Sequence, residues 1–108
     1  MSNEFLDSLE NLDALNVSDF IKFSQRGIEK ENLRSSKCSI SLKAHPKAYG
    51  SSLTNSRITT DFSEALIELV TDPNKDLNKC LKELEDIVYF CLKNTDEDFW
   101  PASIPMSI

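Results

Sequence analysis

The sequence predicts one small α+β domain, in which helices pack on an antiparallel sheet. Three patterns support this fold class. Apolar residues recur at helical spacing in residues 4–24 and again in residues 75–94, and they alternate with polar residues between positions 27 and 43. At 108 residues, 40% of them hydrophobic, the chain can bury one modest core and is expected to form a single domain.

The first region, residues 4–24, carries a helical repeat of apolar residues that is interrupted near Asn16. We therefore expect two short helices. Ser18 and Asp19 are candidate caps of the second helix, because their side-chain oxygens can accept hydrogen bonds from free backbone N–H groups.

A β-hairpin is expected next. Residues 27–34 fit a strand, residues 35–37 fit a polar turn, and residues 38–43 alternate Ile40 and Leu42 with serines. Successive side chains of a strand point to opposite faces, so Glu29 and Glu31 would share a face with their Cβ atoms about 6–7 Å apart. Such a pair of carboxylates suits a divalent cation.

A second acidic stretch, residues 58–68, adds Asp61, Glu64 and Glu68 among apolar residues. Its secondary structure is ambiguous. All three acids fit one helical face, with Asp61 and Glu64 as a capping box, whereas Glu64 and Glu68 fit one strand face. Periodicity alone slightly favours a helix. Taken together, the two acidic stretches predict a metal and phosphate site.

The rest of the chain reads more simply. His45 and Pro46 begin an irregular or briefly helical segment that ends near Gly50, and residues 51–56 form a polar connection. The segment through residue 71 ends at Asp72 and Pro73. Residues 75–94 give the clearest helix, with an apolar stripe made of Leu77, Leu81, Leu84, Val88 and Cys91.

Composition excludes several classes of protein. A net charge of −6 argues against nucleic acid as a partner, and anionic ligands such as ATP would need a bridging metal ion. The three cysteines show no CxxC pair and are expected to be free thiols, with Cys80 and Cys91 in the core. No apolar run is long enough to span a membrane, and the first residues lack the basic start of a secretory signal peptide. We therefore expect a cytoplasmic protein.

Five ordered motifs match one protein family. They are RGIEKENLR at 26–34, HP at 45–46, GS at 50–51, ITTDFSEALIE at 58–68 and WPASIP at 100–105. From about residue 23 onward, the chain resembles the proteobacterial type of glutamate–cysteine ligase, also called γ-glutamylcysteine synthetase. Relatives often carry Cys where Met106 stands here, which removes a thiol at that point.

The resemblance implies an activity. The γ-carboxylate of glutamate would be joined to the amine of cysteine at the expense of ATP, through an acyl phosphate, as the first step of glutathione synthesis. Glutamate, cysteine and ATP would be the small-molecule substrates, and Mg²⁺ or Mn²⁺ the cofactor. Because family members are several times longer, residues 1–108 would be an N-terminal portion of the catalytic domain, with a helical lead-in over about 1–24, and would be inactive alone.

The resemblance also implies a fold and a ligand set. The fold would be the N-terminal part of a glutamine synthetase-like antiparallel sheet, whose acidic face holds the metal, and residues 64–70 would form a strand of it. The implied metal ligands are Glu29, Glu31, Asp61 and Glu68, with Glu64 as a weaker candidate.

Alternatives remain open from the sequence. Glu29 and Glu31 would also fit a solvated strand face, and Asp61 a helix cap or turn. Arg26 and Arg34 would suit phosphate or substrate carboxylate, or equally surface pairing with nearby acids. His45 is more simply structural than catalytic. Two rival functions are a related carboxylate–amine ligase with another acceptor, and a non-enzymatic interaction domain that docks a partner through its 77–91 stripe.

Overall fold

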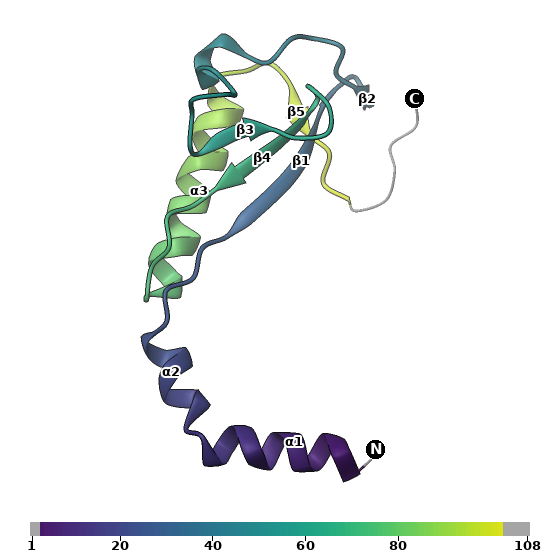
Figure 1. Cartoon of the computed structure of the whole chain (residues 1–108). Coiled ribbons are helices and arrows are strands. Elements are labelled where there is room, and N and C mark those ends of the chain that lie inside the picture. Colours follow the sequence, from purple (N-terminus) through teal and green to yellow (C-terminus); the bar gives the residue numbers. More distant parts are fainter. Residues whose placement is uncertain (1–2, 103–108) are drawn as a thin grey trace.

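The computed structural model describes residues 3–102 of the chain and has the expected α+β fold. Figure 1 shows one helix running along one side of a small sheet and two helices extending away from it. The elements in order are α1 Asn3–Ala14, α2 Val17–Phe23, β1 Glu29–Ser36, β2 Ser39–Ile40, the 3₁₀ turn η1 Lys47–Tyr49, β3 Ile58–Thr60, β4 Leu66–Val70, α3 Leu77–Lys93 and β5 Asp98–Phe99.

The sheet is antiparallel throughout and is organised around β1. The strand order is β2-β1-β4-β3, and β5 pairs with β1 beyond the end of β4. After β5, the backbone N–H of Trp100 donates a hydrogen bond to the Leu33 carbonyl at 2.8 Å. The region around Trp100 therefore joins the sheet.

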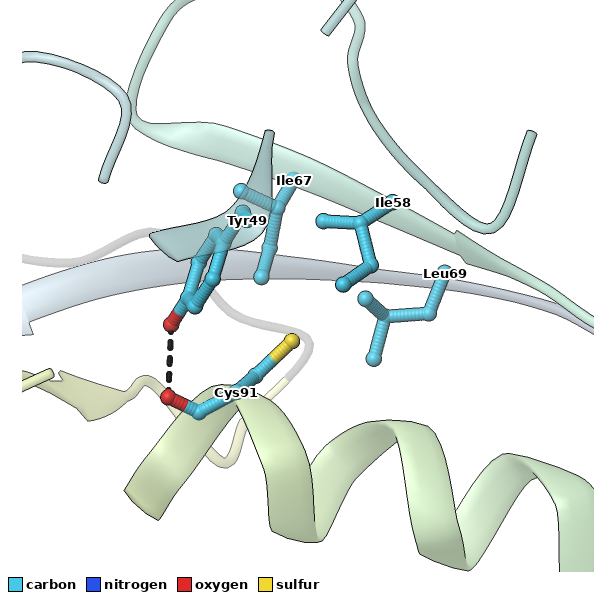
Figure 2. Close-up of a cluster of buried hydrophobic side chains, with 5 residues drawn as sticks. All are labelled: Tyr49, Ile58, Ile67, Leu69 and Cys91. Carbon is cyan, nitrogen blue, oxygen red and sulfur yellow. Dashed lines mark hydrogen bonds between the residues drawn. The ribbon is translucent and has the colours of Figure 1, made fainter. Parts of the chain in front are cut away.

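The core lies between the sheet and α3. Tyr49, Ile58, Ile67, Leu69 and Cys91 form the buried cluster, which Figure 2 draws as sticks. Ile67 and Leu69 are fully buried, whereas Leu66, Glu68 and Val70 are only half-buried, because alternate residues of β4 point to the opposite face. One face of the sheet is thus closed by α3, and the other carries the acidic residues.

The helix α3 confirms the clearest element of the sequence pattern. The side chain of Asp76 caps it by accepting a hydrogen bond from the N–H of Asn78 at 2.9 Å. Leu84, Ile87 and Val88 pack against the buried cluster, and Cys80 and Cys91 are buried free thiols, as expected. Of the stripe proposed for docking a partner, Leu84, Val88 and Cys91 pack toward this protein's own sheet, whereas Leu77 and Leu81 are each 51% exposed.

The slight preference for a helix in the second acidic stretch was wrong. Residues 58–60 and 66–70 are the strands β3 and β4, and Asp61 and Glu64 form no capping box. Pairing with β1 overrides the local helical pattern, because it satisfies the backbone hydrogen bonds of β4 along its whole length. The paired residues run from Glu29 opposite Val70 to Leu33 opposite Leu66. The strand implied by the family resemblance, residues 64–70, contains β4.

The first region forms two helices, as predicted, with the break at Asn16. Asn16 adopts a left-handed conformation with φ 53° and occupies the N-cap position of α2 without a side-chain cap bond. The prediction of Ser18 or Asp19 as cap was wrong, because α2 begins at Val17 and includes both residues. Neither helix has a buried residue, and Phe20 and Phe23 are 75% and 71% exposed.

A hairpin is present, but the turn predicted at residues 35–37 lies at 37–38, because β1 continues through Ser36, and the second strand is shorter than expected. Ser35 lies opposite Ile40 and Ser36 opposite Ser39, which leaves Lys37 and Cys38 as the turn. Both turn residues have positive φ, 50° and 63°. This is the conformation of a type I′ hairpin turn, in which Asn and Gly are preferred.

Candidate metal site

Three carboxylates converge on the sheet face opposite α3. Glu31, Asp61 and Glu68 each place one carboxylate oxygen within 4.8 Å of the others. Glu31 comes from β1, Glu68 from β4, and Asp61 directly follows β3. The acids are 37 residues apart in sequence at most, yet β-pairing brings them to one point.

The register explains the convergence. Glu31 is directly opposite Glu68 in the β1–β4 pair, and Thr59 of β3 is opposite Glu68 on its other side. Side chains of directly paired residues lie about 5 Å apart at Cβ on the same face. Asp61, two residues beyond Thr59, reaches back to the same face at the end of β3.

Glu29 lies beside this group rather than in it. Its backbone partner is Val70, so it is diagonal to Glu68 and on the same face as Glu31. Its charge contributes to raising the pKa of Glu68, as described below. Glu29 and Glu31 therefore lie on one face of the sheet, as predicted, and of the two only Glu31 belongs to the convergent group.

The group is electrostatically uncompensated. The pKa of the Glu68 carboxyl is raised by partial desolvation and by the charges of Glu29, Asp61 and Glu31. None of the ion pairs found within residues 3–102 involves any of these four acids. Close carboxylates without a counter-charge are what a divalent cation neutralises.

The donor set fits Mg²⁺ or Mn²⁺ in kind and in spacing. All ligands are carboxylate oxygens, which hard cations prefer. Octahedral Mg²⁺ with oxygens at about 2.0–2.1 Å holds them about 3 to 4 Å apart. The observed limit of 4.8 Å is close to that range, and Glu31 and Asp61 are exposed, so small side-chain rotations would complete the approach.

Glu64, the weaker candidate, is placed differently. Its carboxylate accepts a hydrogen bond from the backbone N–H of His45 at 2.9 Å, and it is not part of the convergent group. Among the described residues it fixes the segment before η1. His45 itself packs edge-on against the Tyr49 ring, at 5.6 Å between centroids, in line with a structural role.

The surface pairing expected for Arg34 was wrong, because its side chain is fully buried. Its guanidinium forms an ion pair of 2.6 Å with Glu97, whose side chain is also buried. Glu97 was missed in the sequence because it lies in an acidic run at 96–98 that looks like a solvated surface. Glu97 can be recognised as a buried ion-pair partner only from the position of Arg34 in the folded chain. Arg26 pairs with Asn74 through backbone hydrogen bonds.

Within residues 3–102, no helix is both long and apolar enough to cross a membrane. The departure noted at Met106 lies outside the described residues.

Known proteins resemble this chain in sequence. A family profile described as Glutamate-cysteine ligase matches residues 9–108. A curated protein named glutamate–cysteine ligase from Aliivibrio fischeri (strain MJ11) is 42% identical over 104 residues, and one from Pseudoalteromonas translucida (strain TAC 125) is 44% identical over 107 residues. Each alignment covers 94% of this chain and 20% of the relative, so the chain spans about one fifth of the length of the curated relatives it matches.

Solved structures resemble it in fold. A crystal structure of glutamate–cysteine ligase from Francisella tularensis in complex with AMP aligns with a TM-score of 0.75 at 41% identity, covering 78% of this chain and 18% of that one. A bifunctional glutathione synthetase from Pasteurella multocida aligns with a TM-score of 0.76 at 28% identity, covering 82% of this chain and 13% of that one. With the family profile matching nearly its whole length, the chain belongs to the glutamate–cysteine ligase family.

Proposed function

We propose that these residues supply part of the metal and ATP-phosphate site of a glutamate–cysteine ligase, which joins glutamate to cysteine at the expense of ATP. The observation that carries this proposal is the convergence of Glu31, Asp61 and Glu68 on one sheet face in a chain of this family. The relative solved with AMP supports use of an adenine nucleotide. Such an enzyme would draw on the ATP of the cytoplasm, and we propose that location for it.

In this proposal, Glu31, Asp61 and Glu68 hold Mg²⁺ or Mn²⁺, and Glu29 is an adjacent fourth carboxylate. The ion would neutralise charge on the phosphates of ATP, which is most of what phosphoryl transfer requires from its surroundings. The strands β1 and β4 fix the two opposed glutamates, so the ligands need little reorganisation on binding. Glu64 would have to release the His45 N–H group to join them, so we give it no ligand role.

The chain by itself should be catalytically silent. It corresponds to about one fifth of the length of its curated relatives, and we propose that residues 1–108 form the N-terminal part of the catalytic domain. The remaining four-fifths would supply the other nucleotide contacts and the acceptor pocket. Cysteine as acceptor rests on the family alone, and a related carboxylate–amine ligase would differ there.

Metal binding is the first test. We expect the purified chain to bind Mn²⁺, measured by the loss of the free-ion electron paramagnetic resonance signal, and Mg²⁺ to compete. The Glu31→Gln and Glu68→Gln variants should bind at least tenfold more weakly. A wild-type chain that leaves the Mn²⁺ signal unchanged would remove the metal assignment.

The proposed ligase activity can be tested in a chimaeric enzyme. This chain would replace the matching segment of the Aliivibrio fischeri relative, with which it is 42% identical. We expect phosphate release that depends on ATP, glutamate, cysteine and Mg²⁺ together, and its loss on Glu31→Gln. If the folded chimaera binds Mn²⁺ yet turns over nothing, the ligase assignment fails while the metal site stands.

A further inference from the structure

Asp61 is the member of the convergent carboxylate group that does not lie in a strand. It follows β3 and opens the loop of residues 61–65 that leads into β4. Within the loop, the N–H of Asp61 donates to the Leu66 carbonyl at 3.3 Å, and the N–H of Leu66 donates to Ser63 at 3.1 Å. Whatever holds this loop against the sheet therefore sets where the Asp61 carboxylate stands relative to Glu31 and Glu68.

Arg34 holds the loop at two successive carbonyl groups. Its backbone N–H donates to the Ala65 carbonyl at 2.8 Å, and its Nη2 donates to the Glu64 carbonyl at 3.1 Å. The same Nη2 donates to the Lys43 carbonyl at 2.7 Å. One side chain thus ties the loop before β4 to the segment after β2.

Glu97 holds the guanidinium in place. Its carboxylate accepts from Nη1 of Arg34 at 2.6 Å, and the hydroxyl of Ser41 lies 3.4 Å from the same nitrogen. The side chains of Arg34 and Glu97 are 0% and 2% exposed. A buried cation needs a partner in good geometry, and Glu97 is that partner.

Arg34 and Glu31 belong to the same strand, three residues apart. The strand that carries one ligand therefore also clamps the loop that carries another. We propose that Arg34, held by Glu97, is a positioning residue that sets the distance of Asp61 from Glu31 and Glu68. This inference rests on the proposed metal site and adds to it a supporting pair that touches no ligand side chain.

The test uses Arg34→Lys in the full chain. Lysine keeps the positive charge for Glu97, but a single ammonium group cannot reproduce the planar fork that reaches Glu97, Lys43 and Glu64 together. Partners that hydrogen-bond a metal ligand directly contribute tenfold to a hundredfold in affinity, and Arg34 acts one step further away, so we expect Mn²⁺ affinity to fall by about tenfold. The matched control is Arg57→Lys, whose ion pairs with Asp72 and Glu83 lie at the surface, and it should leave Mn²⁺ affinity unchanged.

A double-mutant comparison separates positioning from general damage. If Arg34 acts through Asp61, then Arg34→Lys should weaken Mn²⁺ binding in the wild-type chain but have no further effect when Asp61→Asn is already present. Additive losses in the two backgrounds would overturn the inference, as would unchanged affinity in Arg34→Lys. A wild-type chain that binds no Mn²⁺ would instead overturn the proposed function.

Folding of each variant is checked by its urea unfolding transition. Should Arg34→Lys fail to fold, Glu97→Gln serves in its place, because the glutamine oxygen still accepts from the guanidinium but no longer holds it by charge. We expect a smaller loss of Mn²⁺ affinity, of a few fold, again absent in the Asp61→Asn background. Unchanged affinity in folded Glu97→Gln would contradict the positioning role.

Discussion

Glu31 and Glu68 stand directly opposite each other in the β1–β4 pair, two like charges at a position where natural sheets favour opposite ones. Neither has a cation partner among the ion pairs of the described chain. Their neighbours Ile67 and Asn32 point to the buried face. The pair therefore adds repulsion to the folded state without adding to the core.

We predict that Glu31→Gln has two effects of opposite sign. Without metal, the free energy of unfolding should rise by about 0.2–1 kcal/mol, because a like-charge cross-strand pair is removed. Mn²⁺ affinity should fall at least tenfold, because a ligand oxygen loses its charge. Urea unfolding and Mn²⁺ titration measure the two quantities separately.

Glu64→Gln is the matched control, since it also removes one acidic charge nearby. Its amide oxygen can still accept from the His45 N–H, so neither stability nor Mn²⁺ affinity should change by much. An equal loss of Mn²⁺ affinity in both variants would mean that overall charge, rather than the convergent group, attracts the ion.

Tyr49→Phe should destabilise the fold by about 1–2 kcal/mol. The Tyr49 hydroxyl donates to the Cys91 carbonyl at 2.8 Å, near the C-terminal end of α3, where helix carbonyls lack intrahelical partners (Figure 2). The change leaves that buried carbonyl without its donor. Tyr89→Phe, at a residue that is 64% exposed, should be nearly neutral in the same urea experiment.

Stability should fall at alkaline pH in part because of Cys91. Burial raises the pKa of this thiol from 9.0 to about 11, so between these values the unfolded chain loses a proton that the folded chain keeps. The unfolded state then binds fewer protons, and the free energy of unfolding decreases as pH rises through that window, by on the order of 2 kcal/mol.

The variant Cys91→Ala checks this assignment. It should be less stable than the wild-type chain at pH 7, because it leaves a cavity beside Ile67 and Leu69, but its stability should decline less between pH 9 and pH 11. Parallel stability curves for the two proteins would show that the buried thiol does not cause the decline. Unfolding under reducing conditions keeps thiol oxidation out of the measurement.

Cys38→Gly should stabilise the hairpin by about 1 kcal/mol. Cys38 is exposed and has a φ of 63°, a conformation that glycine adopts without strain. Ser39→Gly, one residue later in β2, should instead destabilise the fold, because it removes the hydrogen bond from the Ser39 hydroxyl to the Ser36 carbonyl and gives the unfolded chain more freedom. A Cys38→Gly variant no more stable than the wild-type chain under reducing conditions would contradict the turn geometry.

The regular parts of the fold could be predicted from the sequence because they repeat locally. The apolar period ending at Cys91 marked α3, and the break at Asn16 marked two N-terminal helices. The strand pattern placed Glu29 and Glu31 on one face, which the register confirms. These features depend on spacing along the chain, and spacing is what a sequence displays.

The remaining features depend on contacts between distant segments. The stretch at 58–70 fitted both periodicities, and only pairing with β1 decides for strands. The burial of Arg34 needs Glu97, 63 residues away, and neither residue differs locally from a surface charge. The convergence of Asp61 with Glu31 likewise follows from the order of strands in the sheet, which no local pattern contains.

The alternation along β4 separates its residues into a buried set and a set on the opposite face. Ile67 and Leu69 are buried on the side of α3. Glu68 lies between them and faces the opposite side, so a substitution there would not disturb the core. With neutral residues opposite each other at positions 31 and 68, the folded chain would be more stable than with the two acids found there. The mutually repelling side chains at these two positions therefore point to a role of this face other than stabilising the fold.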